Sequence, residues 1–120
     1  MTHIMISICY LIHILTEPFK EECIKETGVD ITYANRVFLY SEYPEDEPLK
    51  CYIKCISMRM NILNGSSGKW EKSEVIQQVS GITSESYQNC NDETEAESNL
   101  CQNSFDMSKC FVRQVSVDDE

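Results

Sequence analysis

The clearest pattern of apolar and polar positions begins at Asp46 and indicates a helix. Asp46 can cap its N-terminus, and Pro48 then lies in its first turn, where proline is tolerated. The pair Asn64-Gly65 can close the helix, because both residue types adopt the left-handed backbone conformation more readily than others do. We therefore predict a helix between these start and stop signals.

The apolar residues of this predicted helix cover well over half of its circumference at 100° per residue. Lys54, Ser57 and Asn61 fall together on the remaining strip, and Arg59 is the one polar residue on the apolar arc. A helix that is apolar over so much of its surface needs neighbours on several sides. We expect it to be the central helix of the domain.

Weaker signals predict further helices on both sides of this one. Strands are weakly supported, because the chain has no internal repeat and no block of strict apolar and polar alternation. A first helix is expected to begin near Thr16, with Pro18 in its opening turn, and to stop at Gly28. The other predicted helices cover residues 32–40, 70–80, 91 to about 108, and 110–115.

Residues 4–15 form a mostly apolar run that is too short to cross a bilayer and has the length of the apolar part of a secretory signal. The signal is imperfect, because no Lys or Arg precedes the run and the residues before a cut near Thr16 are not small. We predict a signal peptide at residues 1–16, one domain at residues 17–120, and a secreted, extracellular protein. The alternative is a buried N-terminal helix.

Length and charge restrict the class of partner. The chain has 120 residues, of which 20 are acidic and 10 are basic, so its net charge is -10. A chain of this length suits a single domain. Proteins that bind nucleic acids need clustered Lys and Arg to displace counterions from phosphates. We therefore expect no nucleic-acid partner and no attachment to anionic membrane surfaces.

Seven cysteines are far more than a chain of this length ordinarily contains, and they suit an oxidising compartment. Cys9 lies in the predicted signal, which leaves six in the predicted domain. Six cysteines allow fifteen pairings, and their spacing alone does not choose among them. The six are Cys23, Cys51, Cys55, Cys90, Cys101 and Cys110.

Two spacings within this set carry a resemblance to a known family. Three residues separate Cys51 from Cys55, within the segment LKCYIKC at residues 49–55. Eight residues separate Cys101 from Cys110. In combination with the six-cysteine count, the pattern resembles the insect odorant-binding proteins of the pheromone-binding and general odorant-binding family over most of the predicted domain.

The resemblance implies a fold and a function. The implied fold is a compact all-α bundle of about six helices, stapled by disulfides and enclosing an apolar cavity. The implied function is that of a secreted carrier, which reversibly binds odorants, pheromones or similar amphiphiles in this internal pocket. The implied disulfides are Cys23–Cys55, Cys51–Cys101 and Cys90–Cys110.

Apolar residues on the expected inner faces are the predicted lining of such a pocket. One hydroxyl group, from Tyr52, Tyr87 or Ser104, is expected to orient the polar end of the ligand. The predicted ligand-binding residues are Phe38, Tyr52, Ile56, Met60, Leu63, Trp70, Val75, Ile76, Val79, Leu100, Phe105 and Phe111.

Nothing in the sequence indicates an enzyme. His3 and His13 both lie in the predicted signal, so the predicted domain has no imidazole to act as a general base, a zinc ligand or a switch near neutral pH. The chain also lacks G-x-S-x-G, calcium-loop and Cys-x-x-Cys patterns. We expect no catalytic residues, no metal and no cofactor, and any acid response must come from carboxylates such as Asp118, Asp119 and Glu120.

A secreted interaction protein is the alternative function, as a venom, salivary or haemolymph component that uses the same scaffold with a solid core. Asn64-Gly65-Ser66 is a sequon for N-glycosylation, although Asn-Gly is also a common turn pair, and both interpretations stay open. An olfactory receptor or another membrane protein is the candidate macromolecular partner. The expected state is a monomer or a weak homodimer.

Overall fold

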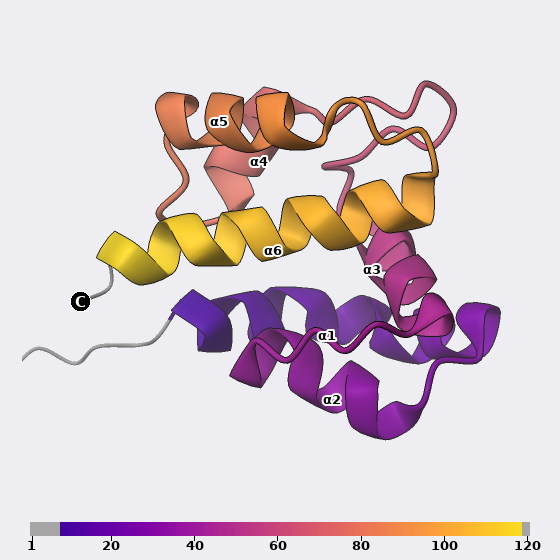
Figure 1. Ribbon diagram of the computed structural model, residues 1–120. Helices are drawn as coiled ribbons and strands as arrows, with labels where there is room; N and C mark the ends of the chain where they lie inside the picture. The colour runs from indigo at the N-terminus through magenta and orange to yellow at the C-terminus, as the bar shows by residue number, and fades with distance from the viewer. Residues whose placement is uncertain (1–7, 119–120) are drawn as a thin grey trace, which may run out of the picture.

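Six α-helices account for most of residues 8–118, the part of the chain that the computed structural model describes. In Figure 1, α1 and α2 lie on one side of α6, α4 and α5 lie on its other side, and α3 crosses at one end. Among these residues the only extended pairing is one antiparallel bridge between Leu63 and Trp70. The predicted all-α, six-helix fold is therefore confirmed. The helices are α1 (Ile8–Thr27), α2 (Ile31–Tyr40), α3 (Glu47–Arg59), α4 (Lys72–Gln78), α5 (Ser84–Thr94) and α6 (Leu100–Asp118).

Capping residues start two helices close to where the sequence predicts them. At the start of α3, the Asp46 carboxylate accepts a hydrogen bond from the backbone N–H of Leu49 at 3.1 Å, and Pro48 lies in the first turn. At the start of α2, Asp30 accepts in the same way from the backbone N–H of Thr32 at 2.8 Å. These contacts satisfy N–H groups that have no partner within the helix.

The prediction that the first helix begins near Thr16 is wrong. α1 already includes Ile8, and Pro18 lies inside it rather than in its opening turn. An interior proline removes one backbone hydrogen bond, but tertiary packing can hold the helix together across it. Thr16 is only 4% exposed and Ile12 packs against the core, so one face of the turns before Pro18 is packed against the rest of the domain.

Removal of residues 1–16 on export stays a prediction. His3 and the side chain of Cys9 lie outside the described residues, as do Asp119, Glu120 and the side chain of Asp118.

The stop signal at Gly28 does end α1, because Gly28 adopts a left-handed backbone conformation with a φ of 71°.

α3 ends at Arg59, several residues before the predicted stop at Asn64-Gly65. Asn61 adopts a φ of 62°, and the backbone N–H groups of Ile62 and Leu63 both donate to the carbonyl of Ser57. This turn sends the chain off the helix axis and buries both apolar side chains. The apolar pattern after Arg59 therefore belongs to a packed loop, which periodicity alone cannot distinguish from a helix.

α5 has no counterpart among the predicted helices before residue 91. Along α5 the only buried apolar side chains are Tyr87 and Cys90, so its periodic signal is weak. Its start is secured instead by a reciprocal cap, in which Thr83 and Ser86 each accept from the backbone of the other through a hydroxyl group.

The predicted helix from residue 91 to about 108 is also wrong. Residues 95–99 separate α5 from α6, and α6 then continues without a break to Asp118. The predicted short helix at residues 110–115 is part of α6. Phe105, Met107 and Val115 are buried on more than one side of this helix, because α6 lies between the two helix pairs (Figure 1).

Three disulfides join the helices, and α3 and α6 each carry two of them. α3 has neighbours on several sides, as expected, because it packs against α1, α2 and α6. It is not the central helix, however, since α6 lies between the two helix pairs (Figure 1). Cys51 and Cys55 lie one turn apart on α3 and reach α6 and α1, respectively. The third bridge joins α5 to α6. The pairs are Cys23–Cys55, Cys51–Cys101 and Cys90–Cys110, with sulfur–sulfur distances of 2.06, 2.08 and 2.01 Å.

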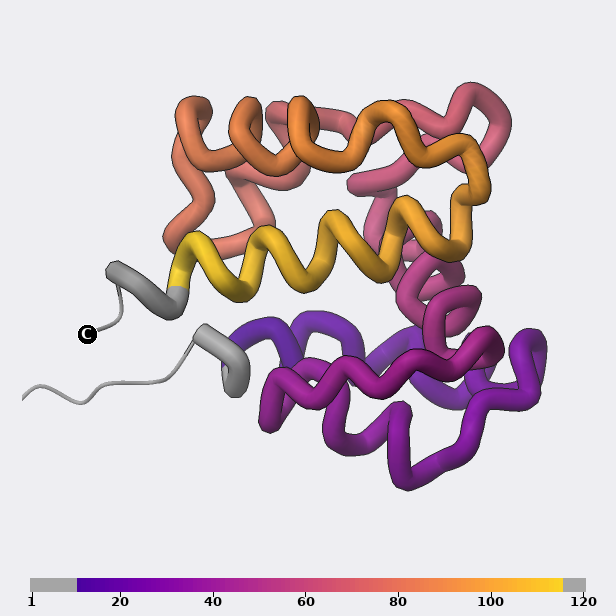
Figure 2. Tube along the Cα trace, viewed as in Figure 1, coloured from indigo at the N-terminus to yellow at the C-terminus, as the bar shows by residue number. Residues whose placement is uncertain are grey.

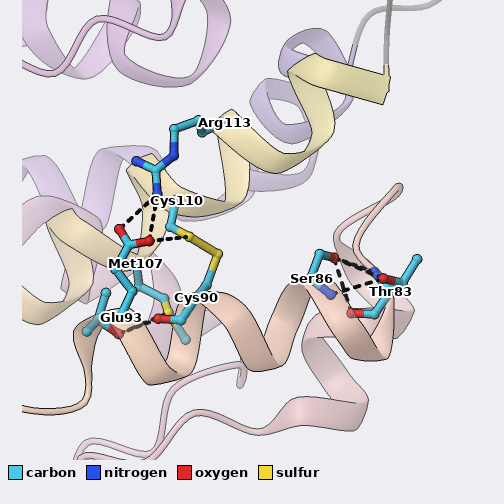
Figure 3. The surroundings of a disulfide bond; sticks show 8 residues. Thr83, Ser86, Cys90, Glu93, Met107, Cys110 and Arg113 are labelled. Atoms are coloured by element: carbon cyan, nitrogen blue, oxygen red, sulfur yellow. Dashed lines mark hydrogen bonds and ion pairs between the residues drawn. A yellow bond between two sulfur atoms is a disulfide. The ribbon is translucent and has the colours of Figure 1, made fainter.

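An ion pair accompanies the bridge between α5 and α6. Arg113 of α6 donates to both carboxylate oxygens of Glu93 on α5, at 2.9 and 2.8 Å, close to the Cys90–Cys110 disulfide (Figure 3). Both charged side chains are about half exposed, so the pair adds little stability beside the covalent bridge.

None of the described helices is long and apolar enough to span a membrane.

Candidate functional site

An apolar pocket lies where α1, α3 and α6 meet the loop at residues 60–71. The first half of α1 and the second half of α6 lie on the same side of the molecule (Figure 2), which lets both contribute to one wall. All but three of the lining side chains are apolar. The lining residues are Ile12, Leu15, Thr16, Phe38, Ile53, Ile56, Ser57, Met60, Ile62, Trp70, Val79, Ser108, Phe111 and Val112.

Each of the three long helices contributes one face to the pocket, at helical spacing. α1 contributes residues 12, 15 and 16, α3 contributes residues 53, 56 and 57, and α6 contributes residues 108, 111 and 112. Positions separated by three and four residues lie on the same side of a helix. The pocket therefore depends on the rotation of each helix about its own axis as much as on its composition.

Trp70 and Phe111 form the aromatic part of the wall, with their rings edge to face and their centroids 6.0 Å apart. The indole N–H of Trp70 donates to the side-chain oxygen of Asn103 at 2.8 Å. The side-chain amide of Asn103 in turn donates to the backbone carbonyl of Thr94 at 3.0 Å. These bonds fix the Trp70 ring and use its only polar hydrogen.

The polar groups of the lining are three hydroxyls. Thr16 donates to the backbone carbonyl of His13 at 3.0 Å, and Ser57 donates to the backbone carbonyl of Ile53 at 2.8 Å. Ser108 shares a hydrogen bond of 2.6 Å with the Tyr43 hydroxyl, in which either oxygen can be the donor. No lining residue has an ionisable side chain.

The pocket is small. Its volume is about 40 Å³, well below the roughly 300–1,000 Å³ of typical ligand pockets. Leu15 and Met60 border this space, and Leu15 keeps 38% of its surface exposed, so the wall at α1 has one side towards solvent. A larger occupant requires the surrounding side chains to move outwards.

Half of the predicted ligand-binding residues line the pocket and half lie elsewhere. Those in the lining are Phe38, Ile56, Met60, Trp70, Val79 and Phe111. Tyr52, Leu63, Val75 and Phe105 are buried in the core away from it, and Ile76 and Leu100 are half-buried outside it.

The hydroxyl groups predicted to orient a ligand are not those in the lining. The Tyr87 hydroxyl lies 3.3 Å from the backbone carbonyl of Trp70, to which it donates. Ser104 is fully buried, and its hydroxyl has no hydrogen-bond partner among the described residues. Tyr52 is 1% exposed, and burial, followed by the negative charge of Glu17, raises the pKa of its hydroxyl well above the ordinary value.

Sequence reasoning missed much of the wall. Ile12, Leu15 and Thr16 lie in the predicted export signal, although their spacing of three and four residues also indicates one face of a helix. Ser57 was placed on the polar strip of its helix, yet it is 6% exposed. Ser108 carries no signal that separates it from an ordinary surface serine.

The predicted glycosylation site lies apart from this lining. Asn64 is exposed, and its side-chain oxygen accepts hydrogen bonds from the backbone N–H groups of Ser66 and Ser67 at 2.9 and 3.0 Å. Glycosylation of Asn64 stays a prediction.

Among the described residues, no three or more His, Cys, Asp and Glu side chains are grouped so that they could hold a metal ion.

Comparison with known proteins adds independent information. The model of the PBP/GOBP family matches residues 13–114. General odorant-binding protein 99a of Drosophila melanogaster is 26% identical over 103 residues, which are 80% of this chain and 71% of the relative. Odorant-binding protein 22 of Aedes aegypti is 28% identical over 99 residues, which are 79% of this chain and 70% of the relative. No solved structure matches the chain. On the family match, this chain belongs to the PBP/GOBP family of insect odorant-binding proteins.

Proposed function

We propose that the protein is a secreted carrier that reversibly binds a small hydrophobic molecule in the pocket between α1, α3 and α6. Family membership implies a carrier of odorants or other hydrophobic ligands, and proteins of this family are not enzymes. The observation that supports this particular site is its lining, which is apolar except for three hydroxyl-bearing side chains. Apolar pockets with a few fixed polar groups are typical ligand sites.

The hydrophobic effect is the expected source of affinity. Burial of about 300 Å² of apolar ligand surface at roughly 25 cal/mol per Å² contributes about 7 kcal/mol before the loss of translational freedom. Converted without that loss, about 7 kcal/mol corresponds to a dissociation constant of about 7 μM, which is the tightest binding that this burial alone supports. Weak, reversible binding of this kind suits a carrier that must release its ligand.

The ligand must enlarge the pocket on entry, because the present volume is about 40 Å³. The unbranched Met60 side chain can change shape at low cost. Leu15 can move towards solvent, since it is already 38% exposed. We therefore propose that both side chains rearrange when a ligand binds.

The small volume is also the observation that favours the second function, an interaction protein with a nearly solid core. On that proposal the scaffold presents its surface to a macromolecule and transports no small molecule. The two functions make opposite predictions in a direct binding experiment.

The test is titration of the oxidised protein with the fluorescent apolar probe N-phenyl-1-naphthylamine, followed by displacement with alcohols, esters and fatty acids. The carrier proposal expects saturable binding with a dissociation constant of about 10 μM or weaker. Val112→Phe should weaken binding at least about fivefold, because the added ring fills the pocket. Ile76→Phe is the matched control, since Ile76 is also half-buried but lies outside the lining.

Failure of the probe to saturate, or equal binding by the two variants, would contradict the carrier proposal. Saturable binding that only Val112→Phe weakens would instead exclude a solid core. Thermal melting of both variants shows whether each retains its fold.

The proposal includes secretion, an olfactory receptor or another membrane protein as a further partner, and a monomer or weak homodimer in solution. The predicted cut after residue 16 would remove Ile12, Leu15 and Thr16 from the pocket wall, so a carrier that uses the whole of this pocket must retain these residues. The six bridged cysteines support an oxidising compartment. N-terminal sequencing of protein exported from insect cells tests the cut near Thr16. Light scattering over a concentration series tests the oligomeric state.

A further inference from the structure

The loop between α3 and α4 holds a reactive pair of residues. Asn64 is the only asparagine of the chain that a glycine follows, and both Asn64 and Gly65 are exposed. In such a pair the backbone nitrogen of the glycine can attack the side-chain amide carbon of the asparagine, because glycine has no side chain to obstruct the approach. The loop therefore contains a candidate site of deamidation.

The attacking nitrogen is free of hydrogen bonds. Among the described residues, no group accepts a hydrogen bond from the backbone N–H of Gly65. Its neighbours are held, since Asn64 donates to the carbonyl of Lys69 at 2.9 Å and Gly68 donates to the carbonyl of Asn64 at 2.8 Å. Solvent can therefore take the proton that the Gly65 nitrogen must lose when it attacks.

The amide oxygen under attack is held by two donors. Oδ1 of Asn64 accepts hydrogen bonds from the backbone N–H groups of Ser66 at 2.9 Å and Ser67 at 3.0 Å. Attack on the amide carbon turns this oxygen into an oxyanion, which oriented N–H donors stabilise more strongly than the neutral oxygen. The loop thus combines an unbonded nucleophile with donors at the place where charge develops.

The reaction balances with water alone. A bond forms between the Gly65 nitrogen and Cγ of Asn64, the Cγ–Nδ2 bond breaks, and ammonia leaves with the proton that the nitrogen has lost through solvent. Water then opens the succinimide ring. Opening at Cγ gives aspartate, whereas opening at the main-chain carbonyl gives isoaspartate, whose backbone runs through Cβ and Cγ and is one atom longer.

The longer backbone would lie in a segment that positions part of the pocket wall. Leu63, the residue before Asn64, forms the antiparallel bridge with Trp70. Asn64 itself pairs with Lys69 through its backbone N–H. Trp70 lines the pocket and is the only tryptophan of the chain. A change of backbone at residue 64 therefore reaches an aromatic side chain of the lining.

We propose that Asn64 is a site of spontaneous deamidation, with the Gly65 nitrogen as nucleophile and the N–H groups of Ser66 and Ser67 as oxyanion donors. The isoaspartyl product loosens the pairing that holds Trp70. The modification does not depend on the proposed carrier function. It competes with glycosylation, because both reactions use the amide nitrogen of Asn64.

The experiment incubates the full oxidised chain for days at neutral pH and physiological temperature, using protein from bacteria so that Asn64 carries no glycan. Trypsin releases residues 60–69, and mass spectrometry of this peptide locates the exchange of NH₂ for OH. Asn61 is the internal control, since it is exposed and lies in the same peptide but precedes Ile62. Asn64 should convert at least about tenfold faster than Asn61, and at least as fast as in the reduced, alkylated and urea-unfolded chain.

The double variant Met58→Ala, Gly65→Ala tests the nucleophile. A Cβ atom at position 65 would meet the Met58 side chain, which Met58→Ala shortens. The added Cβ crowds the attacking nitrogen, so Asn64 should convert at least about tenfold more slowly than in Met58→Ala alone. Circular dichroism checks that both variants are folded.

The fluorescence of Trp70 is the second measurement. Its emission should move to longer wavelength as isoaspartate forms, because looser pairing exposes the ring to water. Equal conversion of Asn61 and Asn64 would overturn the inference, as would conversion in the folded chain more than about tenfold slower than in the unfolded chain. Equal rates in the double variant and in Met58→Ala would exclude the Gly65 nitrogen. Conversion without a change in emission would contradict the effect on Trp70.

Discussion

Lys50 is a nearly buried cation at the contact between α3 and α6. The residue is 8% exposed, and its ammonium group donates to Glu45 at 2.8 Å and to Gln102 at 2.7 Å. It also lies 5.1 Å from the centroid of the Phe105 ring. The hydrogen bond with Glu45 raises the pKa of Lys50 and lowers the pKa of the Glu45 carboxyl group. The charge is thus held by partners on both sides of the helix contact.

Glu45 should therefore make the stability of the fold depend on pH. Because its pKa is lowered in the folded state, its contribution is present above the unfolded value of about 4.5 and is lost as the pH falls through the folded value. Urea unfolding of the unsubstituted chain and of Glu45→Gln should give a difference in unfolding free energy at pH 7 that shrinks towards pH 3. A difference that stays constant over this range would contradict the assignment. Glu21→Gln, exposed on α1, is the control.

At the scale of elements, α1 has two parts with different restraints. The part after Pro18 is tied to α3 by the Cys23–Cys55 disulfide. The part before Pro18 carries Ile12, Leu15 and Thr16 of the pocket wall and has no disulfide among its described side chains. The wall of the pocket therefore includes a segment that none of the three disulfides ties directly to another helix.

A chain that begins at Glu17 should keep all three disulfides and bind the fluorescent probe about tenfold more weakly. Tenfold corresponds to the loss of roughly 1.4 kcal/mol of apolar contact, less than one fully buried aliphatic side chain. Probe titration of the shortened and full chains measures the difference, and mass measurement after alkylation checks the disulfides. Equal affinity of the two chains would show that residues 8–16 do not form part of the working pocket.

At the scale of the whole molecule, charge and pocket are separated. The chain has a net charge of -10, yet none of the lining residues is ionisable. Salt bridges such as Arg36–Glu42 and Arg113–Glu93 lie on exposed side chains outside the lining. Protonation of surface carboxylates should therefore change the affinity for the ligand only by destabilising the fold.

Affinity for the probe should change less than about twofold between pH 8 and pH 6. Titrations at each pH, with circular dichroism to monitor the fold, check this. His13 lies on α1 next to the lining residue Ile12 and 3.7 Å from Glu17, so His13→Gln is the informative variant. A tenfold loss of affinity from pH 7 to pH 6 with an intact fold would contradict the expectation, and its disappearance in His13→Gln would assign it to this histidine.

Several features of the molecule were accessible from the sequence because they depend on local or covalent chemistry. Asp46, Pro48 and Gly28 act at helix ends through their own backbone and side-chain properties, and each acts where expected. The cysteine spacing carried the family resemblance, and the structure contains the disulfides that this resemblance implies. The all-α class followed from the periodic spacing of apolar residues, which indicates helices rather than strands.

The pocket wall was only half accessible, because it depends on contacts between distant residues. Pro18 was interpreted as a helix start since proline is favoured there, whereas packing of the preceding turns extends α1 through it. Tyr52 and Phe105 were expected in the pocket because they are apolar, but an apolar side chain is equally suited to the core beside it.

The sequence by itself determined the fold class, the helix caps and the family, since each of these is encoded by residues close together or by cysteine spacing. Only the tertiary structure decided which side chains face the pocket. Thr16, Ser57 and Ser108 are separated by many residues and become neighbours of one pocket only when α1, α3 and α6 pack with a particular rotation. That rotation is set by the burial of all six helices at once, which no local pattern contains.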